Sequence, residues 1–123
     1  MPKNPHSLST HPITVEPSGG RVVVRVGDVV VADTRDALVL REASYPAAYY
    51  LPAAAVDAGV LRSSDTTTYC PYKGDATYRS LQIGVAAPLQ DAAWVYEDPN
   101  EAVISIRGHL AFYPDKVSIT LED

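Results

Sequence analysis

Two runs of β-branched residues, separated by a Gly-Asp pair, constrain the fold of this chain more than any other feature. Residues 21–26 and 29–33 are mostly valine, and a branched side chain favours an extended, half-buried strand. Gly27 and Asp28 alone lie between them, and a two-residue loop with glycine first is typical of a type II′ β-hairpin. The second run is apolar on both faces, which predicts that it is the more central strand.

The rest of the chain reads as further short strands separated by turn residues. We expect these strands at residues 13–16, 37–41, 49–51, 60–63, 77–85, 92–96, 102–106, 108–113 and 117–121. Residues 53–58 are the one plausible helical turn, with Pro52 near its start and Gly59 after its end. The strands up to residue 41 are expected to form a meander. This pattern predicts a mostly β domain of short antiparallel strands with one short helical turn.

Length, charge and cysteine content limit the classes of function. The chain has 123 residues and a formal net charge of −5, which predicts one domain with no electrostatic drive towards nucleic acid or an anionic membrane. We expect residues 1–12 to be a polar tail and residues 13–123 to be the β domain. One cysteine without a Cys-x-x-Cys pair excludes an internal disulfide and an ordinary structural zinc site, and fits a reducing cytoplasm. No signal-peptide core or membrane-length run is present, and no cofactor or metal is expected.

Residues 66–78 form the stretch most suited to a functional site. Their sequence, Thr-Thr-Thr-Tyr-Cys-Pro-Tyr-Lys-Gly-Asp-Ala-Thr-Tyr, holds the only cysteine. Pro71 favours an extended Cys70 and a tight turn, and Gly74 can adopt a positive φ just after it, so one turn would bring the thiol near the ammonium of Lys73. A nearby cation lowers a thiol pKa and populates the reactive thiolate. Alternatively, the cysteine is a small buried hydrophobe and the lysine pairs with a carboxylate.

A pair between Glu42 and Lys73 is the most specific structural prediction. Both residues flank apolar segments, and a partly buried lysine needs a partner. In a functional interpretation the glutamate orients the lysine or acts with it as an acid or base. In a structural one, a salt bridge fixes the loop to the sheet. Cysteine–histidine catalysis finds little support, because His6 and His11 fall in the tail and His109 reads as an ordinary strand residue.

The aromatic residues are concentrated in these same segments. Tyrosine has an apolar body and a polar tip, so a group of tyrosines can line a pocket for a planar or amphipathic ligand. The alternative, preferred for Trp94 and Phe112, is that the rings are core anchors. With Lys73 and Glu42 as polar anchors, the residues predicted to line the pocket are Tyr45, Tyr72, Tyr78, Trp94 and Tyr96.

Four motifs together carry a resemblance to a known family. In chain order they are Glu42…Tyr45-Pro46…Tyr50…Pro52, Cys70-Pro71-Tyr72-Lys73-Gly74 with Ala76 and Tyr78, Trp94-x-Tyr96-x-x-Pro99, and Gly108…Ala111-Phe112-Tyr113…Val117. Over nearly its whole length the chain resembles a family of small, mostly bacterial and fungal proteins known as a domain of unknown function, sometimes labelled nucleotidyltransferase-like. The resemblance implies a compact, partly open β fold similar to the Mss4-like architecture. It implies no established activity, and it draws attention to Glu42, Tyr45, Cys70, Lys73, Tyr78, Trp94 and Tyr96.

The nucleotidyltransferase label finds no support in the residues. Nucleotidyl transfer generally needs two or more carboxylates that converge on magnesium, and the chain has no close Asp-x-Asp pair. It also lacks a phosphate-binding Gly-x-x-x-x-Gly-Lys-Ser/Thr loop and a Gly-x-Ser-x-Gly elbow. Three hypotheses follow, in this order: a small-molecule binding domain, an enzyme that uses a Lys73-activated Cys70 as nucleophile or redox thiol, and an interaction module that presents a β edge.

Overall fold

The chain folds into short antiparallel strands, as the sequence predicts. The computed structural model describes residues 12–122, so the predicted tail lies outside the described residues except for Pro12. The described part contains ten strands and three short 3₁₀ helices. In chain order these are β1 (Ile13–Pro17), β2 (Arg21–Val26), β3 (Val29–Thr34), β4 (Leu38–Glu42), β5 (Ala48–Tyr50), η1 (Ala53–Ala55), η2 (Ala58–Val60), β6 (Leu61–Cys70), β7 (Gly74–Leu81), β8 (Leu89–Tyr96), η3 (Glu101–Ile106), β9 (Leu110–Phe112) and β10 (Ser118–Glu122).

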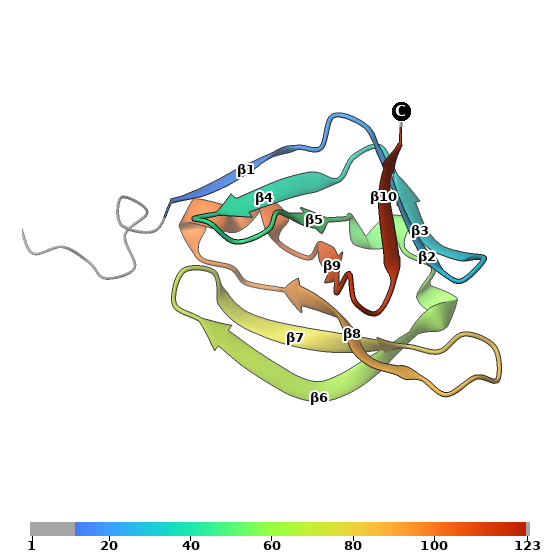
Figure 1. Cartoon of the computed structure of the whole chain (residues 1–123). Coiled ribbons are helices and arrows are strands. Elements are labelled where there is room, and N and C mark those ends of the chain that lie inside the picture. The colour runs from blue at the N-terminus through green and yellow to red at the C-terminus, as the bar shows by residue number, and fades with distance from the viewer. Residues whose placement is uncertain (1–11, 123) are drawn as a thin grey trace, which may run out of the picture.

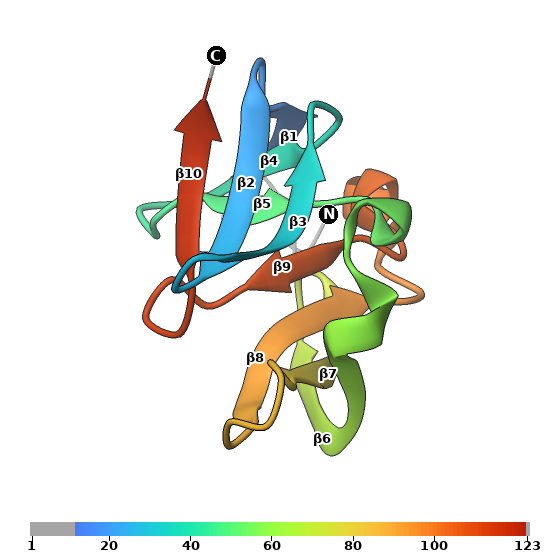
Figure 2. The ribbon, with the colours of Figure 1, turned by 90° about the vertical axis from the view of Figure 1, so that its right-hand side faces the viewer.

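The strands form three antiparallel sheets, with orders β1-β4-β5, β10-β2-β3 and β6-β7-β8-β9. Figure 1 shows the first sheet above the third, and Figure 2 shows β10, β2 and β3 side by side at one end. Leu51, just after β5, joins the first sheet to the third, because its N–H and C=O each bond Leu110 of β9 at 2.8 Å. This bridge fixes how the first and third sheets face each other.

The β2–β3 hairpin is confirmed, but the predicted order of its strands is wrong. Val26 pairs with Val29 across the two-residue loop, and Gly27 alone has a positive φ there, +58°, as a type II′ turn requires. The central strand is β2, whose middle is buried on both faces, whereas β3 is an edge strand. The predicted meander is also wrong, because β10 pairs with β2 and β4 joins a different sheet.

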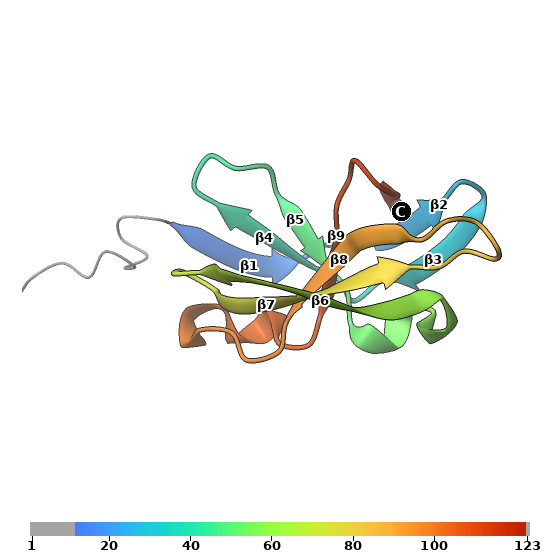
Figure 3. The same cartoon turned by 90° about the horizontal axis from the view of Figure 1, so that it is seen from below.

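Two other segments differ from the sequence-based expectation. The helical turn predicted at residues 53–58 is two 3₁₀ helices, η1 and η2. Residues 102–106 were expected to be extended but belong to η3, where Val103 and Ile106 are buried. Their spacing of three matches a 3₁₀ turn, whereas a strand buries alternate residues. The three 3₁₀ helices lie along one side of the molecule (Figure 3).

The core consists of two clusters of buried side chains. The first is mainly aliphatic and includes Val22, Val24, Leu81 and the fully buried Phe112. The second lies where the first and third sheets meet and contains several tyrosines. Tyrosine brings a hydroxyl into the interior, and that hydroxyl needs a partner or a hollow. The second cluster is therefore the part of the core that can form a polar site. None of the helices at residues 12–122 is long and apolar enough to cross a membrane.

Candidate functional site

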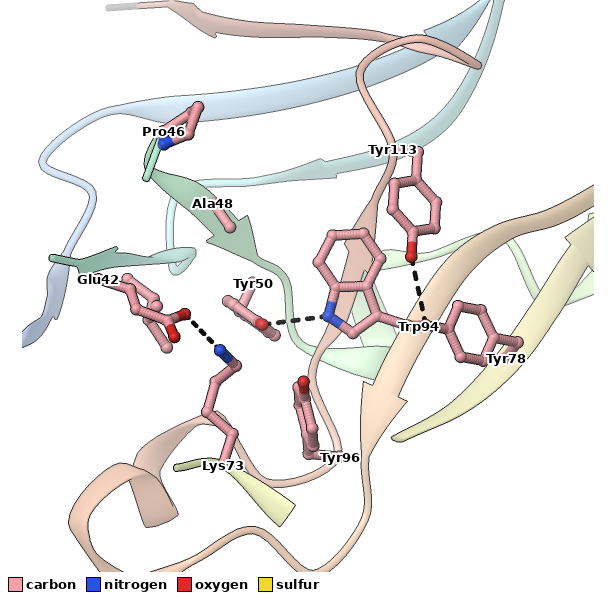
Figure 4. A pocket seen from close by; sticks show the side chains of 10 residues that line it. Glu42, Pro46, Ala48, Tyr50, Lys73, Tyr78, Trp94, Tyr96 and Tyr113 are labelled. Atoms are coloured by element: carbon pink, nitrogen blue, oxygen red, sulfur yellow. Dashed lines mark hydrogen bonds and ion pairs between the residues drawn. The ribbon is translucent and has the colours of Figure 1, made fainter. Parts of the chain in front are cut away.

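A cavity of about 200 Å³ lies between the first and third sheets. Strands β4 and β5 form one wall and β7 and β8 form the other, and Figure 4 shows these side chains converging from both sides. Half of the lining residues are aromatic, and the others include one acid and one base. The lining residues are Leu40, Glu42, Pro46, Ala48, Tyr50, Lys73, Tyr78, Trp94, Tyr96 and Tyr113.

Strand alternation explains why these side chains share one space. Successive side chains of a strand point to opposite faces, so residues two apart share a face. Trp94 and Tyr96 are therefore on one face of β8, and Tyr78 of β7 is directly opposite Trp94 in the register. In the other sheet, Leu40 of β4 is paired with Ala48 of β5. The aromatic face of the β7–β8 hairpin and the mixed face of the β4–β5 hairpin therefore line the cavity from opposite sides.

Lys73 enters the cavity from the tight turn between β6 and β7. The turn was predicted from Pro71 and Gly74, and it closes when the Lys73 N–H donates to the Cys70 carbonyl at 3.2 Å. Gly74 has a φ of +115°, which a residue with a side chain rarely adopts. Asn100, which the sequence did not mark, clamps the turn: its N–H donates to the Lys73 carbonyl at 2.8 Å and its side-chain amide to the Pro71 carbonyl at 3.1 Å.

The predicted pair between Glu42 and Lys73 is confirmed. The ammonium of Lys73 donates to Oε1 of Glu42, and the side chains are only 10% and 14% exposed. Glu42 is the last residue of β4, and Ala43 then leaves the strand with a φ of +47°. The pair therefore ties the β6–β7 turn to the opposite sheet and places one carboxylate and one ammonium at the cavity wall.

Tyr50, Trp94 and Tyr96 form the centre of the aromatic lining. The indole Nε1–H of Trp94 donates to the hydroxyl of Tyr50 at 3.1 Å, and the two rings meet edge to face with centroids 6.2 Å apart. Burial raises the pKa of Tyr50 and of Tyr96, so both hydroxyls stay neutral. Among residues 12–122, the hydroxyl of Tyr96 has no hydrogen-bond partner. Figure 4 shows it directed towards the middle of the cavity.

Tyr78 and Tyr113 form the other end of the cavity, away from the ion pair (Figure 4). Their rings stack with an interplanar angle of 10° and centroids 6.4 Å apart, and their hydroxyls are 3.2 Å apart. The hydroxyl of Tyr78 also lies 3.1 Å from Oγ1 of Thr68. Burial, followed by the hydrogen bond with Tyr78, raises the pKa of Tyr113 to about 12. Trp94 packs on Tyr113 with centroids 4.5 Å apart.

The lining set overlaps with the predicted one without matching it. The cavity brings together Glu42, Lys73, Tyr78, Trp94 and Tyr96. Sequence reasoning missed Tyr50 and Tyr113. The alternation of side chains along a strand could have identified both residues. Tyr50 lies two residues after Ala48, which also lines the cavity, and Tyr113 lies two residues after the buried Ala111.

Three other predicted residues lie elsewhere. Among the described residues, the cavity lining leaves out Tyr45, which is 65% exposed in the β4–β5 loop, and Tyr72, which packs against the second core cluster. Cys70 carries a free, half-buried thiol that packs against the same cluster. In the part of the chain that the structure describes, no group of three or more His, Cys, Asp or Glu side chains is placed to hold a metal ion.

Comparisons with known proteins extend this description. A family model whose description is "Domain of unknown function (DUF427)" matches residues 14–123. That range covers the whole cavity lining and all of the strands except Ile13, the first residue of β1. A search of curated proteins gives no match to the chain. The description of the family assigns no reaction and no ligand, so the geometry of the cavity is the basis for a proposal.

Proposed function

The chain belongs to the DUF427 family, and from that premise we propose that it binds a small, neutral molecule with a single planar ring. The cavity between the first and third sheets is the binding site, with Glu42 and Lys73 as its polar anchors. The observation that carries the proposal is this buried ion pair at the wall of a hollow that is otherwise mostly aromatic. A hollow with a few convergent polar groups is the usual form of a small-molecule site.

The size of the cavity supports a ligand with one ring. A drug-sized ligand occupies a pocket of about 300–1,000 Å³, whereas an apolar cavity of about 150 Å³ accommodates benzene. The cavity here is about 200 Å³. It therefore has room for one six-membered ring with small substituents and is too small for a fused or extended ring system.

The aromatic walls favour a planar ring over an aliphatic one. Trp94 meets Tyr50 at an interplanar angle of 89° and Tyr113 at 43°, so the walls offer both ring faces and ring edges. Aromatic pairs prefer edge-to-face or offset geometry and gain about 0.5–1.5 kcal/mol beyond the burial of their area. A planar ring can use both kinds of contact at once.

The polar anchors favour a neutral oxygen acceptor on the ligand. The ammonium of Lys73 has three N–H donors, of which one bonds Glu42, and the hydroxyl of Tyr96 faces the same cavity without a partner among the described residues. Each of them can donate a hydrogen bond to a ligand oxygen in the cavity. A neutral oxygen leaves the ion pair intact, whereas a carboxylate ligand would bring a second buried carboxylate beside Glu42, which costs several kcal/mol. A phenol or a ketone fits better than an acid.

A titration that follows the indole N–H resonance of Trp94 tests the proposal. Trp94 is the only tryptophan, so its signal in a proton–nitrogen NMR spectrum is unambiguous. We expect 4-methoxyphenol to shift this resonance to saturation with a Kd on the order of 1 mM, about 0.5 kcal/mol per non-hydrogen atom. The charged analogue 4-methoxybenzoate should bind at least about tenfold more weakly.

Matched variants locate the binding. Ala48→Leu fills the cavity and should abolish binding, whereas Ala47→Leu makes the same change at an exposed neighbour outside the lining and should not. Tyr96→Phe removes the cavity hydroxyl at constant shape and should weaken binding about fivefold. Tyr69→Phe, at an exposed tyrosine, should leave the affinity unchanged. A non-saturating shift, or equal binding by Ala48→Leu and Ala47→Leu, would refute the proposal.

A further inference from the structure

We propose that a hollow beyond the Tyr78–Tyr113 pair, whose lining includes several polar residues, is a second subsite, which takes a neutral, polyhydroxylated substituent such as a sugar. This inference rests on the proposed function, because it assigns the rest of the molecule whose ring lies in the aromatic cavity. The ligand class that results is a single ring bearing a sugar, as in an aryl glycoside.

The second hollow shares its boundary with the first. It has a volume of about 310 Å³ and is lined by Thr66, Thr68, Tyr78, Asp91, Tyr113, Asp115 and Lys116. Tyr78 and Tyr113 line both hollows, so the two spaces adjoin at this pair of rings. Figure 4 shows this pair at the opposite end of the first cavity from Glu42 and Lys73. A ring whose oxygen lies at Lys73 therefore directs its opposite substituent towards the Tyr78–Tyr113 pair and the second hollow.

Asp91 is the principal acceptor of the second hollow. Its two carboxylate oxygens accept from the hydroxyls of Ser64 at 2.5 Å and Thr66 at 2.7 Å. Its backbone is held in a left-handed conformation, with a φ of +51°, while its N–H donates to Oγ of Ser80 at 3.0 Å. A carboxylate has about four acceptor positions, so two remain for hydroxyls of a ligand. The hydrogen bonds from Ser64 and Thr66 lower the pKa of Asp91, which keeps the acceptor ionised.

The other groups of the hollow complete a set that suits a sugar. Lys116 supplies a cationic donor whose Nζ bonds the Gln90 carbonyl at 2.5 Å and lies 5.9 Å from the centroid of the Tyr113 ring. Thr68 supplies a hydroxyl and Tyr113 an aromatic ring. A sugar has hydroxyls that both donate and accept, together with apolar C–H groups that can pack on a ring. The hollow therefore offers a partner for each kind of group.

The net charge of the lining favours a neutral sugar over a phosphorylated group. Two carboxylates, of Asp91 and Asp115, line the hollow together with one ammonium, of Lys116. The lining is thus net negative, and a phosphate placed there would be repelled. Hydroxyl donors, in contrast, are stabilised by carboxylate acceptors, which form hydrogen bonds roughly twice as strong as neutral ones.

Two probes that differ only beyond the ring test the inference. Both 4-methoxyphenol and 4-hydroxyphenyl β-D-glucopyranoside present the same phenol to Lys73, but only the second carries a sugar. We expect the glucoside to bind about tenfold more tightly, as one net hydrogen bond to a charged group provides. Asp91→Asn should remove this gain and leave the affinity for 4-methoxyphenol unchanged. Asparagine tolerates the left-handed backbone at this position.

Neighbouring threonines on β6 supply a second, matched comparison. Thr68 lines the hollow, whereas Thr67 is an exposed neighbour outside its lining. Thr68→Val should weaken glucoside binding about threefold and Thr67→Val should not, and valine suits a strand at both positions. If 4-methoxyphenol binds but the glucoside binds no more tightly, or if Asp91→Asn keeps the gain, the second subsite is refuted and the first remains. If 4-methoxyphenol itself fails to saturate, the proposed function fails too.

Discussion

Removing either charge of the Glu42–Lys73 pair should destabilise the protein more than removing both. The two side chains are 10% and 14% exposed, so solvent screens either charge only weakly once its partner is gone. Breaking a buried pair costs about 3–5 kcal/mol, whereas replacing both partners with neutral groups is often close to neutral. We expect Lys73→Met to lower the free energy of unfolding by about 3 kcal/mol. The double variant Lys73→Met/Glu42→Gln should recover to within about 1 kcal/mol of the parent protein.

Urea unfolding of the four proteins in this cycle measures the coupling directly. The coupling energy is the amount by which the double variant departs from the sum of the single variants. The burial of the pair predicts a coupling energy of at least about 2 kcal/mol. If the single effects add to within about 0.5 kcal/mol, the ion pair is a solvated surface contact. The cavity would then lack the charged anchor on which ligand binding depends.

Four further predictions concern the core, pH, the turn and the thiol. Phe112→Ala should lower the free energy of unfolding in urea by about 3–5 kcal/mol, because Phe112 is buried. A loss below about 1 kcal/mol would show that Phe112 lies outside the core. Burial raises the pKa of Tyr50 and Tyr96 above the ordinary value of 10.0, so at high pH the unfolded chain loses phenol protons that the folded chain keeps. The free energy of unfolding should therefore fall between about pH 9 and about pH 11. A rise over this range would contradict the prediction. Gly74→Ala should lower the free energy of unfolding by about 1–3 kcal/mol, measured by thermal or urea unfolding. The reason is that Gly74 has a φ of +115° and that an added Cβ would lie 3.4 Å from the carbonyl oxygen of Asp98. An unchanged stability would show that the alanine is not strained. The double variant Lys73→Met/Glu42→Gln should leave the alkylation rate of Cys70 in the folded protein unchanged, since Glu42 engages the ammonium and both charges are removed together; a large slowing would favour the enzyme hypothesis instead.

The features that could be predicted from the sequence are those fixed by neighbouring residues. The β2–β3 hairpin follows from Gly27-Asp28 between two valine-rich runs, and the β6–β7 turn follows from Pro71 and Gly74. Backbone restrictions at glycine and proline act within a few residues, so they can be read without knowledge of the fold. The family resemblance, read from motifs along the whole chain, is confirmed as well.

The arrangement of strands into sheets depends on pairings between distant residues. The central place of β2 results from its pairing with β10, which starts at Ser118, and nothing in the composition of β2 indicates that partner. The apolar character of residues 29–33 favoured β3 for the centre, but Val29 and Val30 are about half exposed at a sheet edge. The division of the chain at residue 12, the Mss4-like architecture and the cytoplasmic location remain predictions.

The ion pair of the site was predicted, because a buried lysine requires a partner. Part of the aromatic lining was missed, because it depends on the direction in which each side chain points. A lysine beside apolar segments needs a carboxylate, and that requirement alone identified the pair of Lys73 with Glu42. The choice among tyrosines relied on closeness to the signature motifs, which does not say where a side chain points. Tyr45 and Tyr50 belong to the same motif, but Tyr45 lies in an exposed loop, whereas Tyr50 is two residues beyond Ala48 on one face of β5. Alternation along the strand was the better guide.

A crystal structure of the complex with 4-methoxyphenol is the most direct test of ligand binding in the aromatic cavity. We predict the ring in the cavity, packed against the aromatic lining, with its phenolic oxygen about 2.7–3.2 Å from Nζ of Lys73. The methoxy group should point towards the Tyr78–Tyr113 pair. Density for the ligand only on the outer surface of the protein, with the cavity unoccupied at a saturating concentration, would contradict the proposed function.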